Sequence, residues 1–110
     1  MTNRVVITGM GGVSSIGMSV PEIYNSMKEG KSGIGMLEFP DVARLKVKTG
    51  GQIKNFNAND YFELQKIARM DRFSQLALLA ANEAIMSSGL KNSQENWSEN
   101  AGIILGSSIG

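Results

Sequence analysis

The sequence predicts an α/β protein in which helices cover a sheet of buried strands. Two apolar runs, residues 4–8 and 101–105, have no alternation of polar and apolar side chains, which is typical of strands buried on both faces. Two helical segments lie between them, so the order of elements favours layered α/β architecture. The second run is followed by a glycine-rich stretch, which suits the middle of a larger sheet better than its edge. We therefore expect the fold to be incomplete within these 110 residues.

A first helix is predicted over residues 20–29. Ser19 and Glu22 form a capping-box pattern, in which the serine accepts from free N–H groups and the glutamate reaches back. Pro21 lies in the first turn, where no N–H is needed. Gly30 suits the left-handed position just after the helix end.

The middle of the chain is predicted to be less regular. Residues 31–50 are rich in turn-forming residues and contain a proline, which discourages helix and strand alike. Residues 52–54 could form a short strand. Asn59 or Asp60 can cap a short helix that ends near residue 65.

The clearest helix is predicted over residues 68–88. Its apolar residues recur at steps of three and four, and its small alanines would allow a neighbour to approach closely. Gly89 is a stop signal for this helix. The predicted apolar face consists of Met70, Phe73, Leu76, Ala77, Ala80, Ala81, Ala84 and Ile85.

Composition excludes several classes of function. The chain has no cysteine and no histidine, so it offers no disulfide, thiolate nucleophile, imidazole base or zinc site built from these residues. Serine, carboxylate or lysine chemistry remains possible, and we expect no metal or cofactor in this chain. A net charge of +1 gives no broad attraction to nucleic acid or to a membrane, and neither is an expected partner. The absence of cysteine and of a long apolar run favours a cytoplasmic protein.

A glycine-rich turn follows the first apolar run. Gly9 and Gly11 match the first two glycines of a dinucleotide-binding fingerprint, but Ser14 stands at the third position and no acidic residue follows at the required distance. A phosphate-cradling loop is one interpretation, because glycine lets backbone N–H groups face an anion. The pattern favours a purely structural turn, and a small nucleotide-binding module remains an alternative function.

Charged residues gather at the head of the long helix. One interpretation is a solvated helix end, with Asp71 favourably placed near the positive end of the helix dipole. The other is a contact for an acidic partner through Lys66, Arg69 and Arg72. The pattern alone favours the first. At the other end of the chain, Ser107 lacks a histidine base that would make it a nucleophile.

Taken together, four segments resemble the start of the β-ketoacyl–acyl-carrier-protein synthases, in particular the chain-elongating type related to synthase II. The resemblance covers residues 4–110, and the motifs stand in the family's order and spacing. It identifies residues 1–110 as the N-terminal part of a β-ketoacyl synthase N-terminal domain and implies a thiolase-like layered fold. The segments are residues 4–11, 30–34, 69–73 and 106–110.

The resemblance implies decarboxylative condensation of an acyl thioester with a malonyl thioester on acyl-carrier protein, in fatty-acid or polyketide biosynthesis. The family's cysteine nucleophile and two histidines lie beyond the region that resembles this chain, so the isolated chain is expected to be inactive. Complete members are homodimers. An alternative in a different class is a non-catalytic chain-length-determining subunit, which resembles the synthases but lacks the cysteine.

The resemblance also assigns candidate site residues. Ile109 matches the isoleucine that lines and gates the acyl-chain pocket, and Ser108 replaces the usual glycine before it. Arg69 matches a basic position that contacts the acidic carrier protein, and Lys66 lies close to it in sequence. Two further basic positions of the family are uncharged here.

Overall fold

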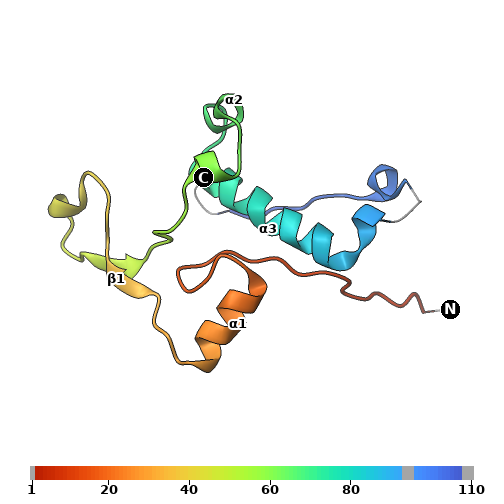
Figure 1. Cartoon of the computed structure of the whole chain (residues 1–110), viewed down its shortest axis with the longest axis horizontal. Helices are drawn as coiled ribbons and strands as arrows, with labels where there is room; N and C mark the ends of the chain where they lie inside the picture. Colours follow the sequence, from red (N-terminus) through yellow and green to blue (C-terminus); the bar gives the residue numbers. More distant parts are fainter. Residues whose placement is uncertain (1, 93–95, 108–110) are drawn as a thin grey trace.

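A computed structural model describes residues 2–92 and 96–107 of the chain. Its helices are α1 (Val20–Lys28), α2 (Leu64–Ile67) and α3 (Arg72–Ser88), and its strands are β1 (Ile34–Met36) and β2 (Thr49–Gly51). Figure 1 shows an open arrangement around α3, and the chain measures 56 × 38 × 27 Å along its principal axes. The predicted mixture of helices and strands is confirmed. Short 3-10 turns lie at Val42–Arg44, Ala58–Asp60, Leu90–Asn92 and Trp97–Asn100.

Helix α1 forms as its local signals predict. The Ser19 hydroxyl accepts the Glu22 N–H at 3.4 Å, and the Glu22 carboxylate accepts the N–H of Met18 at 2.7 Å. The glutamate thus reaches back one residue beyond the cap. Gly30 adopts φ +66°, which confirms the predicted left-handed end.

Replacing Ser19 with alanine is expected to lower the free energy of unfolding by about 1 kcal/mol, because an N–H of the first turn loses its acceptor. Ser19→Asp keeps a capping oxygen and is the matched control. Urea denaturation of the full-length protein would measure both variants. Equal losses in the two variants would show that the cap contributes nothing.

A small antiparallel sheet occupies a region predicted to be irregular. Strands β1 and β2 pair with Ile34 opposite Gly51 and Met36 opposite Thr49. The prediction of irregular structure holds for residues 37–48 apart from one 3-10 turn, but it was wrong at β1 and at residues 49–50. The strand predicted at residues 52–54 was also wrong, because β2 lies just before them. Backbone pairing with a partner along the chain overrides the weak strand propensity of these glycine-rich segments.

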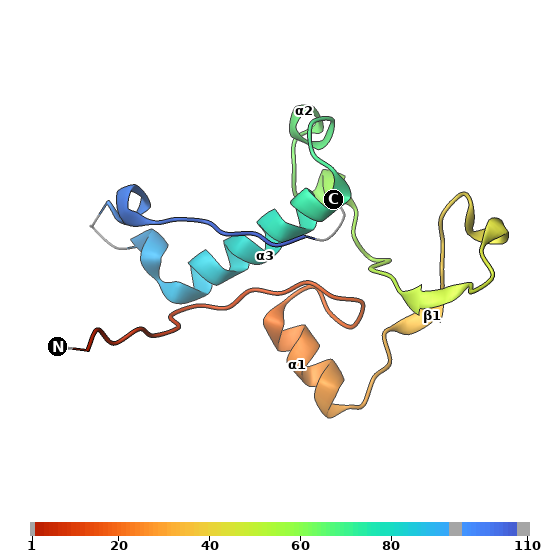
Figure 2. The same cartoon turned by 180° about the vertical axis from the view of Figure 1, so that it is seen from behind.

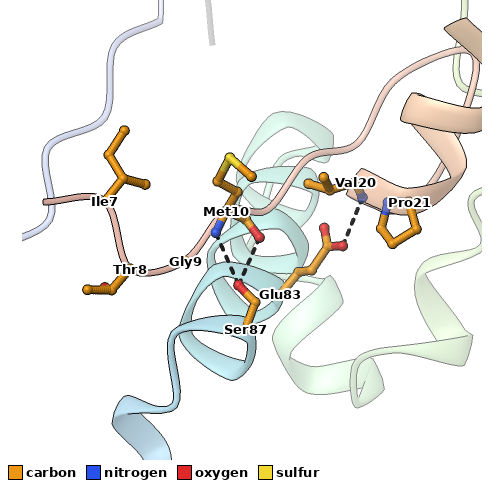
Figure 3. Close-up of a pocket in the computed structure, with 8 residues that line it drawn as sticks. All are labelled: Ile7, Thr8, Gly9, Met10, Val20, Pro21, Glu83 and Ser87. Carbon is orange, nitrogen blue, oxygen red and sulfur yellow. Dashed lines mark hydrogen bonds between the residues drawn. The ribbon is translucent and has the colours of Figure 1, made fainter.

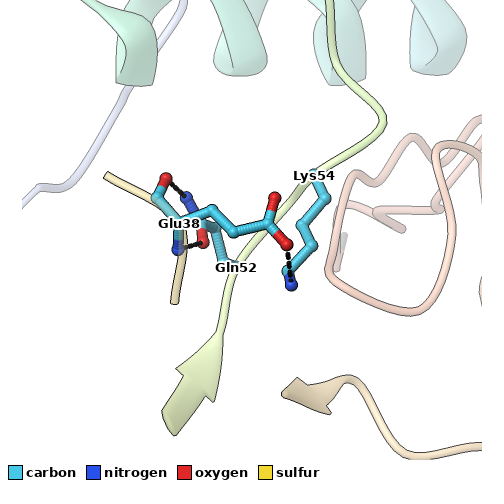
Figure 4. A network of polar contacts seen from close by, with 3 residues as sticks. All are labelled: Glu38, Gln52 and Lys54. Atoms are coloured by element: carbon cyan, nitrogen blue, oxygen red, sulfur yellow. Dashed lines mark hydrogen bonds and ion pairs between the residues drawn. The ribbon is translucent and has the colours of Figure 1, made fainter. Parts of the chain in front are cut away.

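Side chains extend this sheet beyond its last backbone pair (Figure 4). The Gln52 amide accepts the Glu38 N–H at 2.7 Å and donates to the Glu38 carbonyl at 2.9 Å, as a strand residue would. The Glu38 carboxylate also receives the Lys54 ammonium at 2.6 Å. Residues 52–54 are therefore joined to Glu38 by the side chains of Gln52 and Lys54, and not by the backbone pairing of the predicted strand.

The turn before α2 differs from its prediction as well. Asn57, not Asn59 or Asp60, caps the 3-10 turn Ala58–Asp60 by accepting the Asn59 N–H at 3.2 Å. The chain then leaves helical geometry and α2 begins at Leu64. The Asn57 side chain supplies the acceptor nearest to the turn, so the helix start predicted at residue 59 or 60 was wrong.

Phe56 is the one buried apolar side chain among the residues described, with 7% of its surface exposed. The Phe56 ring stacks on the Tyr61 ring, with 5.7 Å between the two centroids. The Arg72 guanidinium lies 5.2 Å from the centroid of the Phe56 ring. Arg72 also donates to the Ile53 carbonyl at 2.6 Å. These contacts fasten the loop at residues 53–61 to the head of α3.

Helix α3 begins at Arg72, four residues later than predicted. Asp71 holds the N-cap position without a side-chain cap bond, and the buried Gln75 donates to the Met70 carbonyl at 3.0 Å. Residues before Asp71 belong to α2 and the turn that follows it. Gly89 adopts φ +76° and ends the helix where predicted.

The two predicted buried strands are wrong for the described structure. Residues 4–8 and 101–105 form no strand, and Ile7 and Ile103 expose 85% and 87% of their surfaces. A strand needs a neighbour for its backbone groups, and within the described ranges neither run has one. Figures 1 and 2 show residues 101–105 passing along α3, whereas residues 4–8 extend beyond its end toward the N-terminus. Within residues 2–92 and 96–107, no helix combines the length and apolarity needed to cross a membrane.

Candidate functional site

The glycine-rich turn lies against one flank of α3 (Figure 3). The Ser87 hydroxyl accepts the Met10 N–H at 3.1 Å and lies at the same distance from the Met10 carbonyl oxygen. Glycine is needed here because the backbone of the turn passes close to the helix: a methyl group added at Gly11 would overlap the Ala80 carbonyl oxygen. The turn is therefore held by direct backbone contact with α3.

Glu83 joins the turn to the start of α1. One carboxylate oxygen accepts the Gly12 N–H at 2.9 Å, and the other accepts the Val20 N–H at 2.8 Å. Val20 is the first residue of α1, whose N–H groups lack intrahelical acceptors. A half-buried carboxylate thus occupies a place where helix geometry favours negative charge.

A cavity of about 370 Å³ opens beside these groups. Its position agrees with the interpretation of the turn as a phosphate cradle, but its chemistry does not. The Gly12 and Val20 N–H groups already bond to Glu83, and a bound phosphate would place a second negative charge beside that carboxylate. The cavity is lined by Ile7, Thr8, Gly9, Met10, Val20, Pro21, Glu83 and Ser87.

An apolar groove of about 420 Å³ lies on a second flank of α3. Helix side chains form one wall and the exposed run at residues 103–105 forms the other, so an aliphatic group would suit it. The chain then leads to Ser108 and Ile109, the predicted acyl-pocket residues, which lie outside the described residues. The groove is lined by Ser74, Ala77, Leu78, Ala81, Ile103, Ile104 and Leu105.

The three cations at the head of α3 differ in the contacts that they make. Lys66 on α2 and Arg69 in the turn after it are both exposed, and the Arg69 N–H donates to the Lys66 carbonyl at 3.1 Å. Across residues 2–92 and 96–107, neither side chain forms an ion pair. Arg72 is exposed as well, but its guanidinium donates to the Ile53 carbonyl at 2.6 Å. Of these three exposed cations, Lys66 and Arg69 are the two whose side chains form no hydrogen bond or ion pair among residues 2–92 and 96–107.

Sequence reasoning missed Glu83 and Ser87. Both lie on the flank of α3 that holds the turn, and their partners are far away in sequence. The one sequence feature that could have indicated Glu83 is that it is a single acidic residue in a helical stretch otherwise rich in alanine and apolar residues.

Comparison with known proteins places these features in a family context. Residues 2–110 match the family model described as the N-terminal domain of β-ketoacyl synthase. The chain is 39% identical to 3-oxoacyl-[acyl-carrier-protein] synthase 2 of Staphylococcus aureus (strain COL), over 97% of the chain and 26% of that protein. It is 40% identical to nodulation protein E of Rhizobium sp. (strain N33), over 87% of the chain and 24% of that protein. The chain spans about a quarter of the length of these relatives.

Proposed function

The chain belongs to the β-ketoacyl synthase family, and from this premise we propose that it is the N-terminal part of a 3-oxoacyl-[acyl-carrier-protein] synthase. The match across residues 2–110 is the observation that carries the proposal. In this assignment the chain forms the first part of the enzyme's N-terminal domain. The complete protein acts in fatty-acid or polyketide biosynthesis.

The reaction is a decarboxylative condensation. A cysteine thiolate takes the acyl group from its thioester, the malonyl thioester loses CO₂, and the resulting carbanion attacks the acyl-enzyme and releases the thiolate. Two histidines assist decarboxylation and stabilise the oxyanion. Because this chain has neither residue type, we propose that all three lie in the remainder of the protein and that the isolated chain is inactive.

Within this function, the chain contributes substrate contacts. Lys66 and Arg69 are exposed, which supports a contact with the acidic carrier protein. Ile109 and Ser108 line the acyl pocket in this proposal, which is supported by the resemblance of residues 106–110 to the family's turn. The groove along α3 has the apolar character of a surface that another part of the protein covers.

The proposal includes a complete thiolase-like layered fold and a cytoplasmic homodimer. Val5 and Ile104, at 93% and 101% exposure, support the idea that segments outside this chain cover its apolar surface.

The test combines the mass of the native gene product with a condensation assay. The chain spans 26% of the synthase 2 relative, so we expect a product of about four times 11.8 kDa. This product should convert an acyl thioester and malonyl-carrier protein into 3-oxoacyl-carrier protein and CO₂, and iodoacetamide should abolish formation of the 3-oxoacyl product by alkylating the thiolate. A product near 11.8 kDa would overturn the proposal. A full-length product without the cysteine and without CO₂ release would indicate a non-catalytic subunit.

A further inference from the structure

The first turn of α1 has a complete set of hydrogen-bond partners. Pro21 has no N–H, the Glu22 N–H donates to the Ser19 hydroxyl, and the Ile23 N–H donates to the Ser19 carbonyl at 3.0 Å. The remaining N–H, that of Val20, donates to Glu83. Since the other groups are satisfied locally, only the Val20 N–H depends on a group from elsewhere in the chain.

The same carboxylate serves a second, separate segment. The Gly12 N–H belongs to the glycine-rich turn, and it approaches the other Glu83 oxygen at 2.9 Å. Two backbone N–H groups that face one carboxylate, one of them at a helix start, form the kind of site that binds small oxyanions. Here the occupant is covalently part of the protein.

We propose that Glu83 is the resident ligand of an anion-binding site formed by the Gly12 and Val20 N–H groups, and that its carboxylate positions the turn and α1 on α3. This accounts for the phosphate-loop character of the turn without a bound nucleotide. The site's chemistry is that of a small carboxylate. Removing the Glu83 side chain leaves both N–H groups directed at a space that formate can fill.

The experiment measures thermal unfolding of the full-length protein with sodium formate, at ionic strength matched with sodium chloride. Glu83→Ala should lower the unfolding midpoint by about 5 °C, because two N–H groups lose a charged acceptor. Formate should restore at least half of this loss in Glu83→Ala and leave wild type unchanged. Loss of stability without formate-specific recovery would overturn the proposal.

Ser87→Ala is the matched control. It removes the other side-chain anchor of the turn, the bond to Met10, from the same flank of α3. The midpoint should fall in this variant too, but formate should not restore it, since no anion site is vacated. Equal recovery in both variants would show that formate acts generally and would count against the proposal.

Glu83→Gln covers the outcome in which Glu83→Ala does not fold. The amide has the shape of the carboxylate but only one acceptor oxygen, so one N–H loses its partner. Amide hydrogen exchange at Gly12 or Val20 should therefore accelerate, while exchange at Met10 stays at the wild-type rate. Wild-type exchange at both Gly12 and Val20 in this variant would overturn the proposal. None of these measurements depends on condensing activity, so they can fail or succeed independently of the proposed function.

Discussion

Replacing Gly11 with alanine is expected to lower the free energy of unfolding by about 3 kcal/mol or more, because the new methyl group has no room. It would overlap the Ala80 carbonyl oxygen and lie 2.8 Å from the Ala84 nitrogen. Both atoms belong to the backbone of α3, which cannot rotate away as a side chain can. The turn must instead move off the helix, which lengthens the bond between Gly12 and Glu83.

Gly35→Ala is the matched control for this substitution. A methyl group at Gly35 would meet no heavy atom within 4 Å, and Gly35 lies in a strand. Its effect should stay within about 0.5 kcal/mol, as for an ordinary surface change. Urea denaturation of the full-length protein would measure both variants. Similar effects of the two substitutions would refute the close packing of the turn on α3.

Reversing the two exposed charges at the head of α3 should have the largest effect on activity. We expect the double variant Lys66→Glu and Arg69→Glu to lower kcat/KM for carrier-bound acyl substrate about tenfold, equivalent to about 1.4 kcal/mol. In the proposed contact with the acidic carrier protein, each substitution would replace attraction with repulsion. The effect should shrink as salt is raised, because exposed charges are screened.

Two controls isolate the carrier contact. Acyl pantetheine offers the same thioester without the carrier protein, and its turnover should not change in the double variant. Lys91→Glu alters an exposed lysine beyond the other end of α3 and should leave kcat/KM for the carrier-bound substrate within twofold of wild type. If the double variant loses activity equally with acyl pantetheine, the two residues do not act through carrier binding.

The helices were predictable because their signals are local. The Ser19 cap, Pro21 in the first turn and the stops at Gly30 and Gly89 all act within a few residues of the helix ends. The start of α3 was predicted too early, because the helical spacing of apolar residues includes Met70 whereas the helical backbone begins only at Arg72. The periodicity of apolar residues identifies the apolar face of a helix, but the hydrogen bonds at the helix start determine the residue at which the helix begins.

The strands were not predictable in the same way, since pairing depends on partners that local composition does not reveal. Residues 4–8 and 101–105 have strand composition but no paired neighbour among the described residues. Strands β1 and β2 include glycines of low strand propensity, yet they pair because the intervening loop brings them together.

The site was partly predictable for a related reason. Lys66 and Arg69 were identified from charge and resemblance, and their exposure agrees with a contact role. Their binding to a carrier, and the pocket roles of Ser108 and Ile109, remain predictions. Glu83 was missed because its function is defined by backbone N–H groups 71 and 63 residues away, which no local pattern encodes.

These sequence separations also bear on the order of folding. Closing a loop of this length costs conformational entropy that grows as about (3/2)RT ln n, before the contact returns any energy. Helix α1 and helix α3 can each form from neighbouring residues in a far shorter time. We therefore expect the Glu83 bridge to form late, after the transition state has assembled the helices. An interaction absent from the transition state slows unfolding rather than speeding folding, so we expect this carboxylate to contribute chiefly to how long the folded state persists.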